Sequence, residues 1–497
     1  MSEQFYTYNS MPGTYPENFS ETSTYTLMAM PNTDEGYVFS YWEVKTITTT
    51  CTGETIKTDI YTQNPLTVSI LETGKYVTAT FLKLSESPSL FFPHISTKSP
   101  WETEICVINT NADKNMLGTL RAYTDSGQPI DTKSISLYPH GRRELKVADW
   151  FANPNSIGHI DFHADISGAV GYTKFYQEGK FRAAIPAIKE VNTSDIYVPH
   201  IASNNTFWTG ISLVNSTSLT KNLTIRFNDG RQAVVSLNPN EHKAFTIASL
   251  FGGTPQPNIK SATISNASGI VGLELFGTST QLDGIVLTDD TTITIYYPHV
   301  ANVQSWWTGI VAYNPANTAN QLTVTPFSEE GNMLAGATIN IAAKDKYIGL
   351  VRNLNLPDQT AWFRITATQP LVGFELFSTL DNRQLAAYAE GNSAGAKQGV
   401  FPKIDQDGWT GVAFVNTESY PANVTLTAYR NDGLNVATAT IRVNSHAKVV
   451  EMAESIFSNS NISIASYIGF TSDRRVVGFQ LNGSSDGKML DGIPALY

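Results

Sequence analysis

Short apolar segments separated by turn residues run along most of the chain after residue 90. Between residues 207 and 285 the apolar positions fall into short runs, and none has the spacing of a long helix. The segments predicted to be strands are 207–215, 222–227, 232–237, 243–248, 260–265, 270–276 and 282–285. Glycine, proline and asparagine lie between them, as expected for turns. Seven or so strands in about a hundred residues predict an antiparallel β-sandwich.

The same pattern occurs four times. Each copy begins near a proline followed by histidine or lysine, and later contains a Val-Gly pair. The prolines are Pro93, Pro199, Pro298 and Pro402, and the glycines are Gly171, Gly272, Gly373 and Gly478. A period of about a hundred residues is too long for a solenoid, and each copy can close its own core. We therefore predict an all-β chain with a linear array of four antiparallel β-sandwich domains. Their expected ranges are 88–194 (diverged), 195–293, 294–397 and 398–497.

Short helical turns are also predicted, at aligned positions between two strands. They are expected at 147–151, 247–251 and 451–457.

Residues 1–87 do not match the repeat and predict a separate small sheet. They contain the motifs Leu-x-Ala-x-Pro, Gly-Tyr-x-Phe-x-x-Trp, Asn-Pro-Leu-Thr-Val and Val-Thr-Ala-x-Phe, beginning at Leu27, Gly36, Asn64 and Val77. These motifs, in this order, resemble the bacterial surface repeat related to the internalin B-repeat, with an insert at 43–63. The resemblance implies a small β-grasp-like domain, an extracellular bacterial protein and no enzymatic activity. It identifies no ligand.

The four copies also resemble a repeat of about a hundred residues found in secreted bacterial proteins. The shared pattern is Pro-His-Ile, then Trp-Thr-Gly-Ile and Asn, then Val-Gly-Phe-Glu-Leu-Phe near the end. The resemblance implies no particular activity. The first copy departs from it, with Glu102 and Glu104 where the second has Trp208 and Gly210.

Charge and hydropathy exclude several classes of partner. The chain has 497 residues, 15% of them charged, with a formal net charge of −11. An acidic protein repels phosphate backbones, so we expect no nucleic-acid partner. No apolar run reaches the roughly 18–20 residues of a membrane span. The first residues lack the features of a signal peptide. We expect a secreted or cell-surface protein whose leader has been removed.

The histidines of the Pro-His pairs are the first candidates for a metal-binding or catalytic role. His94, His200 and His299 occupy this position in three copies, and Lys403 replaces them in the fourth. A metal site needs several ligands that converge, and no partner residue recurs beside them. We predict that they are structural and donate to a backbone carbonyl.

The remaining motifs indicate no catalytic, metal or cofactor site. His159 and His163 align with a strand, in which a four-residue offset spans about 13 Å, too far for one metal ion. Asp405 to Gly408 predicts a turn more readily than a calcium loop. No nucleophile, zinc or nucleotide motif occurs in a supporting context. We therefore expect no enzymatic activity.

The two cysteines are Cys51 and Cys106. A bridge between them is one option. The other is that Cys106, which aligns with strand interiors, is a small buried apolar residue.

Aromatic residues at the start of one strand are the best candidates for binding. Phe207 and Trp306 precede a second ring, Trp208 and Trp307, and Trp101 aligns with them. Neighbouring residues of a strand point to opposite faces, so one core cannot bury both rings. The outer ring packs against a neighbouring repeat or subunit, or it stacks on a sugar.

The strand after these rings is apolar on both faces. In the third copy Ile310 and Ala312 alternate with Val311 and Tyr313. The second face needs a cover, which could be a helical turn, the next repeat or another chain. The interface candidates are Phe207, Trp306, Tyr313 and Trp101.

We expect a structural or adhesive extracellular bacterial surface protein. Its expected partners are further copies of itself, in an oligomer, filament or surface layer, or a cell-surface polysaccharide. The alternative is a carbohydrate-binding protein that uses outer aromatic side chains.

Overall fold

The all-β prediction is confirmed. The computed structural model describes residues 23–29, 37–50, 53–61, 66–70, 75–83, 87–301, 305–389, 395–457 and 460–497. Strands account for 57% of the structure and helices for 4%, and the strands form several antiparallel sheets.

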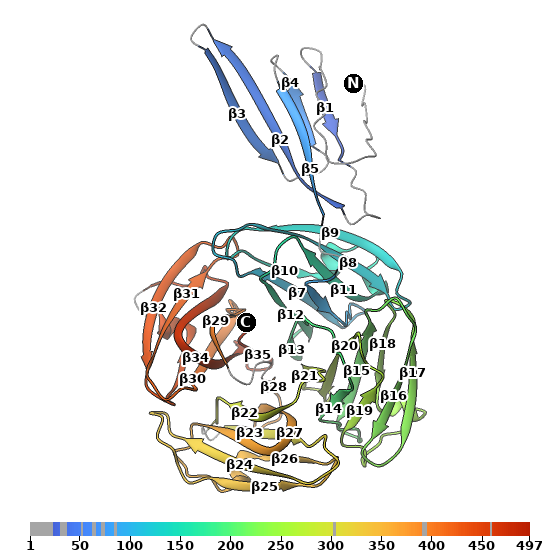
Figure 1. Ribbon diagram of the computed structural model, residues 1–497, viewed down its shortest axis with the longest axis vertical. Helices are drawn as coiled ribbons and strands as arrows, with labels where there is room; N and C mark the ends of the chain where they lie inside the picture. Colours follow the sequence, from blue (N-terminus) through green and yellow to red (C-terminus); the bar gives the residue numbers. More distant parts are fainter. Residues whose placement is uncertain are drawn as a thin grey trace.

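The N-terminal region forms two small sheets, which Figure 1 shows projecting from the rest of the molecule. Its strands are β1 (Ser23–Leu27), β2 (Tyr37–Thr50), β3 (Gly53–Tyr61), β4 (Leu66–Ile70) and β5 (Lys75–Lys83). Strand β1 pairs with β4, and β2 lies between β3 and β5. The insert at 43–63 thus extends β2 and β3 into a long hairpin. Trp42, Val44 and Leu66 belong to a small apolar core between the sheets.

The first repeat, unit 1, is a sandwich of two four-stranded sheets. Its strands are β6 (Leu90–Phe92), β7 (Glu102–Asn109), β8 (Met116–Thr124), β9 (Pro129–Leu137), β10 (Arg142–Lys146), β11 (Ile157–Ala164), β12 (Ala169–Gln177) and β13 (Phe181–Pro186). One sheet has the order β6-β11-β8-β9 and the other β10-β7-β12-β13. The helical segments α1 (Val147–Trp150) and η2 (Pro154–Ser156) connect β10 to β11.

Unit 2 repeats this topology. Its elements are β14 (Ile196–Val198), β15 (Trp208–Asn215), β16 (Lys221–Phe227), β17 (Gln232–Leu237), β18 (His242–Thr246), η3 (Ala248–Phe251), β19 (Ala262–Ser265), β20 (Ile270–Gly277) and β21 (Leu282–Val286). The sheet orders β14-β19-β16-β17 and β18-β15-β20-β21 match those of unit 1. Seven of its eight strands lie close to predicted segments, and β14 was not predicted.

In units 3 and 4 one long strand takes the place of two. Unit 3 contains β22 (Thr292–Tyr297), β23 (Trp306–Tyr313), β24 (Asn320–Phe327), β25 (Ala337–Ile341), β26 (Lys346–Leu350), η4 (Val351–Leu354), β27 (Trp362–Thr379) and β28 (Leu385–Tyr388). Unit 4 contains β29 (Ala396–Phe401), β30 (Gly408–Asn416), β31 (Ala422–Tyr429), β32 (Asn435–Val443), β33 (Lys448–Met452), α2 (Ala453–Ile456), β34 (Tyr467–Ser484) and β35 (Leu490–Pro494). Strands β27 and β34 each pair with both sheets of their unit.

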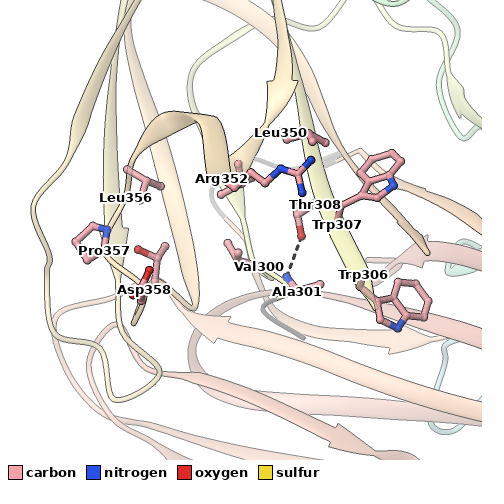
Figure 2. Close-up of a pocket in the computed structure, with 12 residues that line it drawn as sticks. Val300, Ala301, Trp306, Trp307, Thr308, Leu350, Arg352, Leu356, Pro357 and Asp358 are labelled. Carbon is pink, nitrogen blue, oxygen red and sulfur yellow. Dashed lines mark hydrogen bonds between the residues drawn. The ribbon is translucent and has the colours of Figure 1, made fainter. Parts of the chain in front are cut away.

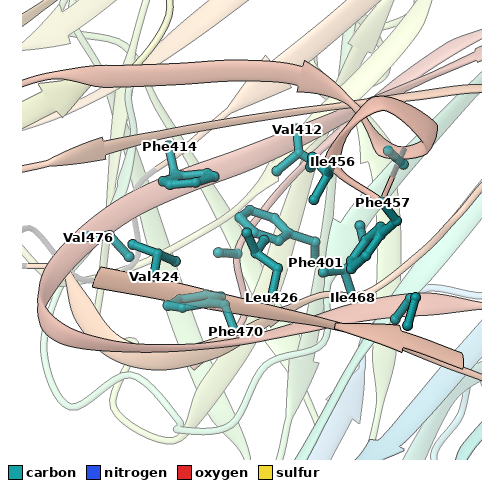
Figure 3. Packing of buried hydrophobic residues seen from close by; sticks show 14 of the residues in the cluster. Phe401, Val412, Phe414, Val424, Leu426, Ile456, Phe457, Ile468, Phe470 and Val476 are labelled. Atoms are coloured by element: carbon teal, nitrogen blue, oxygen red, sulfur yellow. The ribbon is translucent and has the colours of Figure 1, made fainter. Parts of the chain in front are cut away.

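Each unit encloses its own core between its two sheets. In unit 4 the rings of Phe401, Phe414 and Phe470 pack with Val412 and Leu426 (Figure 3). Along β31 every second residue is buried, as expected for a strand with one face on the core.

Close strand pairing explains the repeated Val-Gly motif. Gly272 lies opposite Leu213 in the pairing of β20 with β15. A Cβ atom at Gly272 would lie 2.5 Å from the Ser212 carbonyl oxygen, and one at Gly373 would lie 2.6 Å from that of Val311. The motif thus preserves a close approach between two strands.

The four units form a closed ring, so the linear arrangement predicted from the sequence is wrong. Figure 1 shows the units around a common axis, with β13, β21, β28 and β35 nearest to it. Strand β13 contacts both β21 and β35, and β28 contacts the same two strands. Unit 4 therefore packs against unit 1. Head-to-tail contacts between similar units give a ring when the rotation between neighbours closes.

Candidate functional site

The interfaces between neighbouring units, called seams here, cover the second apolar face of the central strands. Each seam is named by its two units. At seam 2–3, Val311 and Phe374 of unit 3 pack with Phe276 and Ile285 of unit 2. Similar apolar clusters occupy seams 1–2, 3–4 and 4–1. The neighbouring unit is thus the cover that this face requires.

A basic residue at the start of one strand in each unit enters the preceding unit. These residues are Arg142, His242, Lys346 and Lys448. Arg142 Nε donates to the Pro402 carbonyl (3.0 Å), and Lys448 Nζ donates to the Ala361 carbonyl (2.9 Å). Both donors satisfy backbone acceptors of the preceding unit, so these cations help to hold neighbouring units together.

Hairpin tips contact the following unit at three seams, and seam 2–3 differs. A Cβ atom at the tip residues Gly127, Gly331 or Gly433 would collide with backbone atoms of the following unit. At Gly230, the corresponding residue of unit 2, it would meet nothing within 4 Å. The Lys346 backbone N–H donates to its own neighbour Asp345 (2.9 Å) instead of a hairpin carbonyl. Seam 2–3 therefore has fewer polar contacts at its rim.

Glu, Lys and His side chains meet at seams 2–3 and 3–4, where both glutamates are fully buried. Glu274 lies inside seam 2–3 near Lys346, whose Nζ is 3.2 Å from His200 Nδ1. Burial raises the pKa of Glu274 well above its usual range, although Lys346 opposes this. Burial also lowers the pKa of Lys346 to about 8 and that of His200 well below its usual range.

The same arrangement recurs at seam 3–4 with Glu375, Lys448 and His299. The histidines thus lie in structural seams. At His200, Nδ1 faces the Lys346 ammonium group, which can only donate, so this nitrogen accepts and is not the one that could donate to a backbone carbonyl.

Seam 1–2 contains a hydrogen-bonded Ser-His-Asp chain. His242 Nε2 lies 2.9 Å from Ser212 Oγ, and its Nδ1 lies 2.7 Å from Asp125 Oδ1. This connectivity is that of a nucleophilic triad. Ser212, however, is 2% exposed and its hydroxyl donates to the Pro93 carbonyl (2.8 Å). The serine hydroxyl is thus buried and already bonded to a carbonyl, and the Ser-His-Asp chain joins units 1 and 2.

Two further histidines surround His242. His94 Nδ1 lies 3.2 Å from His242 Nε2, and His159 stacks on Tyr123. Within the described residues, no three His, Cys, Asp or Glu side chains converge so that they could hold a metal ion. A cavity of about 500 Å³ opens beside His94, Asp125 and His242.

The histidines of seam 1–2 should make stability depend on pH. Burial, together with the charge of His242, lowers the pKa of His94 and His159 to about 3. Between about pH 6.5 and pH 3 the unfolded chain binds more protons than the folded chain. The free energy of unfolding therefore decreases as the pH is lowered through this range. Each histidine contributes about 1.4 kcal/mol per pH unit. The free energy of unfolding, measured in urea from pH 7 to pH 4, should change less steeply with pH for the His94→Gln/His159→Gln variant than for the unmodified chain. An unchanged slope would contradict the assignment.

An ion-pair network closes the ring at seam 4–1. The Arg182 guanidinium pairs with Asp405 (2.5 Å) and Asp491, and Lys403 Nζ lies 3.3 Å from both carboxylates. All four side chains are buried. Burial raises the pKa of Asp491, but Arg182 and Lys403 outweigh burial and lower it overall. Asp405 thus has a buried ionic role that its interpretation as part of a turn missed.

Three of the four predicted interface aromatics lie at seams within the chain. Trp101 packs against the apolar cluster of seam 1–2, and Trp306 packs against that of seam 3–4. Tyr313 is buried, with its ring 6.3 Å from that of Tyr197 in unit 2. Phe207 is 42% exposed. The four rings therefore form no common surface.

The structure tests the interpretation of one of the two cysteines. Cys106 is a free, buried thiol, which agrees with its interpretation as a small apolar residue. Cys51 lies outside the described residues.

A cavity in unit 3 combines aromatic and charged side chains (Figure 2). It has a volume of about 340 Å³ and lies between the start of β23, the turn η4 and the loop that follows. Its lining includes the half-buried rings of Trp306 and Trp307 and the charged residues Arg352 and Asp358. No described residue pairs with the exposed Arg352 guanidinium. The sequence indicated the tryptophans, but no motif indicated Arg352 or Asp358.

Within the described parts of the chain, no helix has the length and apolar character needed to cross a membrane. Neither a comparison with protein-family models nor a search of curated proteins found a match to this chain. The two resemblances therefore stay predictions.

Proposed function

We propose that this chain is a non-enzymatic structural or adhesive protein of the bacterial surface, either secreted or retained there. The observation that carries the proposal is the burial of reactive polar side chains in the interfaces between units. Side chains that resemble catalytic or metal-binding groups, such as Ser212, His242 and His200, are buried in seams and hold units together. They support a rigid body more than a reaction centre. The bacterial and extracellular location rests on the resemblance of residues 1–87 and of the four repeats.

Self-association is not needed for this proposal. The apolar strand face that led us to predict an oligomer or filament lies inside the ring, as Val311 and Tyr313 illustrate. Any contact between copies has to use another surface.

Adhesion is tested with beads that carry the full chain, coupled through its amino end. Under flow, they should be retained on surfaces coated with bacterial cell-wall polysaccharide or on epithelial cells. Blank beads set the background, and beads with heat-unfolded protein show whether the fold is required. Retention at background on both surfaces would overturn the adhesive role.

A second candidate function is carbohydrate binding, favoured by the unit 3 cavity. Its two tryptophans and its charged residues combine flat apolar surface with polar groups, as small-molecule sites do. A carbohydrate-binding ring would attach to a surface through its glycans, so this candidate specifies how the adhesive role could work.

A further inference from the structure

We propose that the unit 3 cavity binds a pyranose sugar that carries a carboxylate, such as a uronic acid residue. The inference rests on the carbohydrate-binding candidate and names its ligand class. The cavity, about 340 Å³, lies at the small end of the usual range for ligand sites, roughly 300–1,000 Å³. This size suits one sugar residue, with the rest of a chain outside the cavity.

The tryptophans provide the apolar part of the site. Trp306 and Trp307 begin β23 and both line the cavity (Figure 2). Each ring is half-buried, so each has a surface that seam packing does not use. The C–H face of a pyranose ring packs on such an aromatic surface, while the indole edge stays wet.

Arg352 provides the charge selectivity. It lies in the turn η4 and Figure 2 shows its guanidinium group directed toward Thr308 and Trp307. An unpaired guanidinium at a cavity binds a carboxylate through two parallel hydrogen bonds, a geometry that lysine cannot provide. A neutral sugar would leave this cation without a partner.

Asp358 would contact the end of the ligand that lies away from Arg352. Figure 2 shows it across the cavity from Arg352, beside Pro357. A carboxylate there accepts hydrogen bonds from sugar hydroxyls and repels a second anionic group. Together the two residues favour a ligand with one acidic end and one hydroxyl-bearing end, which is the chemistry of a uronic acid.

The combination of aromatic pair and arginine occurs in unit 3 alone among the four units. The residues aligned with Arg352, counted from the start of the preceding strand, are Ala148, Ala248 and Glu454. In unit 4, Gly408 replaces Trp306. The other units therefore lack either the cation or the pair of rings.

The test titrates the full chain with trigalacturonic acid and with neutral galactotriose, using tryptophan fluorescence and saturation-transfer NMR. The acidic probe should bind at least tenfold more tightly than the neutral one, and added salt should reduce the difference. Arg352→Gln should weaken acid binding by about tenfold or more and so remove most of the preference for the acidic probe. Arg383→Gln removes the same charge from another exposed site of unit 3 and should change neither.

Equal binding of the two probes, no binding of either, or an unchanged Arg352→Gln variant would overturn the inference. Equal binding that depends on Trp307 would still support carbohydrate recognition. Bead retention without any sugar binding would support adhesion through another surface, so the proposals can fail separately.

Discussion

Replacing Arg182 by methionine is expected to weaken closure of the ring by about 3–5 kcal/mol. The guanidinium group lies between the buried carboxylates of Asp405 and Asp491, and its loss leaves Lys403 as the remaining cation that contacts both. Removing one partner of a buried ion pair leaves an uncompensated charge away from water. The first transition in urea unfolding should therefore move to a lower concentration, and protease sites in units 1 and 4 should become accessible.

Two variants make this result specific. Arg383→Met removes an exposed arginine of unit 3 and should change stability by less than about 0.5 kcal/mol. Arg182→Met/Asp491→Asn removes a charge from each side and should be more stable than Arg182→Met alone. If Arg182→Met behaves like Arg383→Met, the network does not close the ring.

Replacing Trp362 by alanine is expected to cost about 3–5 kcal/mol. Trp362 is fully buried and belongs to the apolar cluster of seam 3–4. Its ring stacks on Phe327 with centroids 4.3 Å apart, and its indole N–H donates to the His446 carbonyl of unit 4 (2.9 Å). Alanine would leave a cavity at the seam and an unsatisfied carbonyl.

Trp362→Phe separates the two contributions. Phenylalanine keeps a stacked ring and loses the hydrogen bond, so urea unfolding should show a smaller loss than for alanine, with about 1–3 kcal/mol from the unsatisfied carbonyl. An alanine variant as stable as the phenylalanine variant would show that packing of this ring contributes little.

The sandwiches could be predicted because their signals are local. A short run rich in apolar residues between two groups of turn residues defined the strand at 232–237, which β17 reproduces. The Val-Gly motif aligned the four copies, and its cause is a close strand approach within each unit. Turn residues and strand periodicity act over a few residues, so they are visible in the sequence.

Closure of the ring could not be predicted because its contacts link distant parts of the chain. Arg182 pairs with Asp405 and Asp491 across the join between the first and last units, and no local pattern relates them. The apolar second face containing Val311 and Tyr313 showed that a cover was needed, but not that the neighbouring unit provides it.

The unit 3 cavity was predictable in part. The Trp306–Trp307 pair stood out because two neighbouring rings cannot share one core. Arg352 and Asp358 carry no motif, and their position beside the rings depends on the path of η4 and the loop after it. The periodic pattern of apolar residues identifies strands, but it does not predict the backbone path of a loop.

Because the units form a ring, each is held on two sides. Opening one seam, for example seam 2–3 with its unattached hairpin tip at Gly230, leaves every unit connected through the remaining seams. The separated faces stay close to each other, so their effective concentration is high and they meet again without a search through solution. A unit leaves only when two seams open together. A protease that cuts a single linker would therefore nick the ring without releasing a fragment.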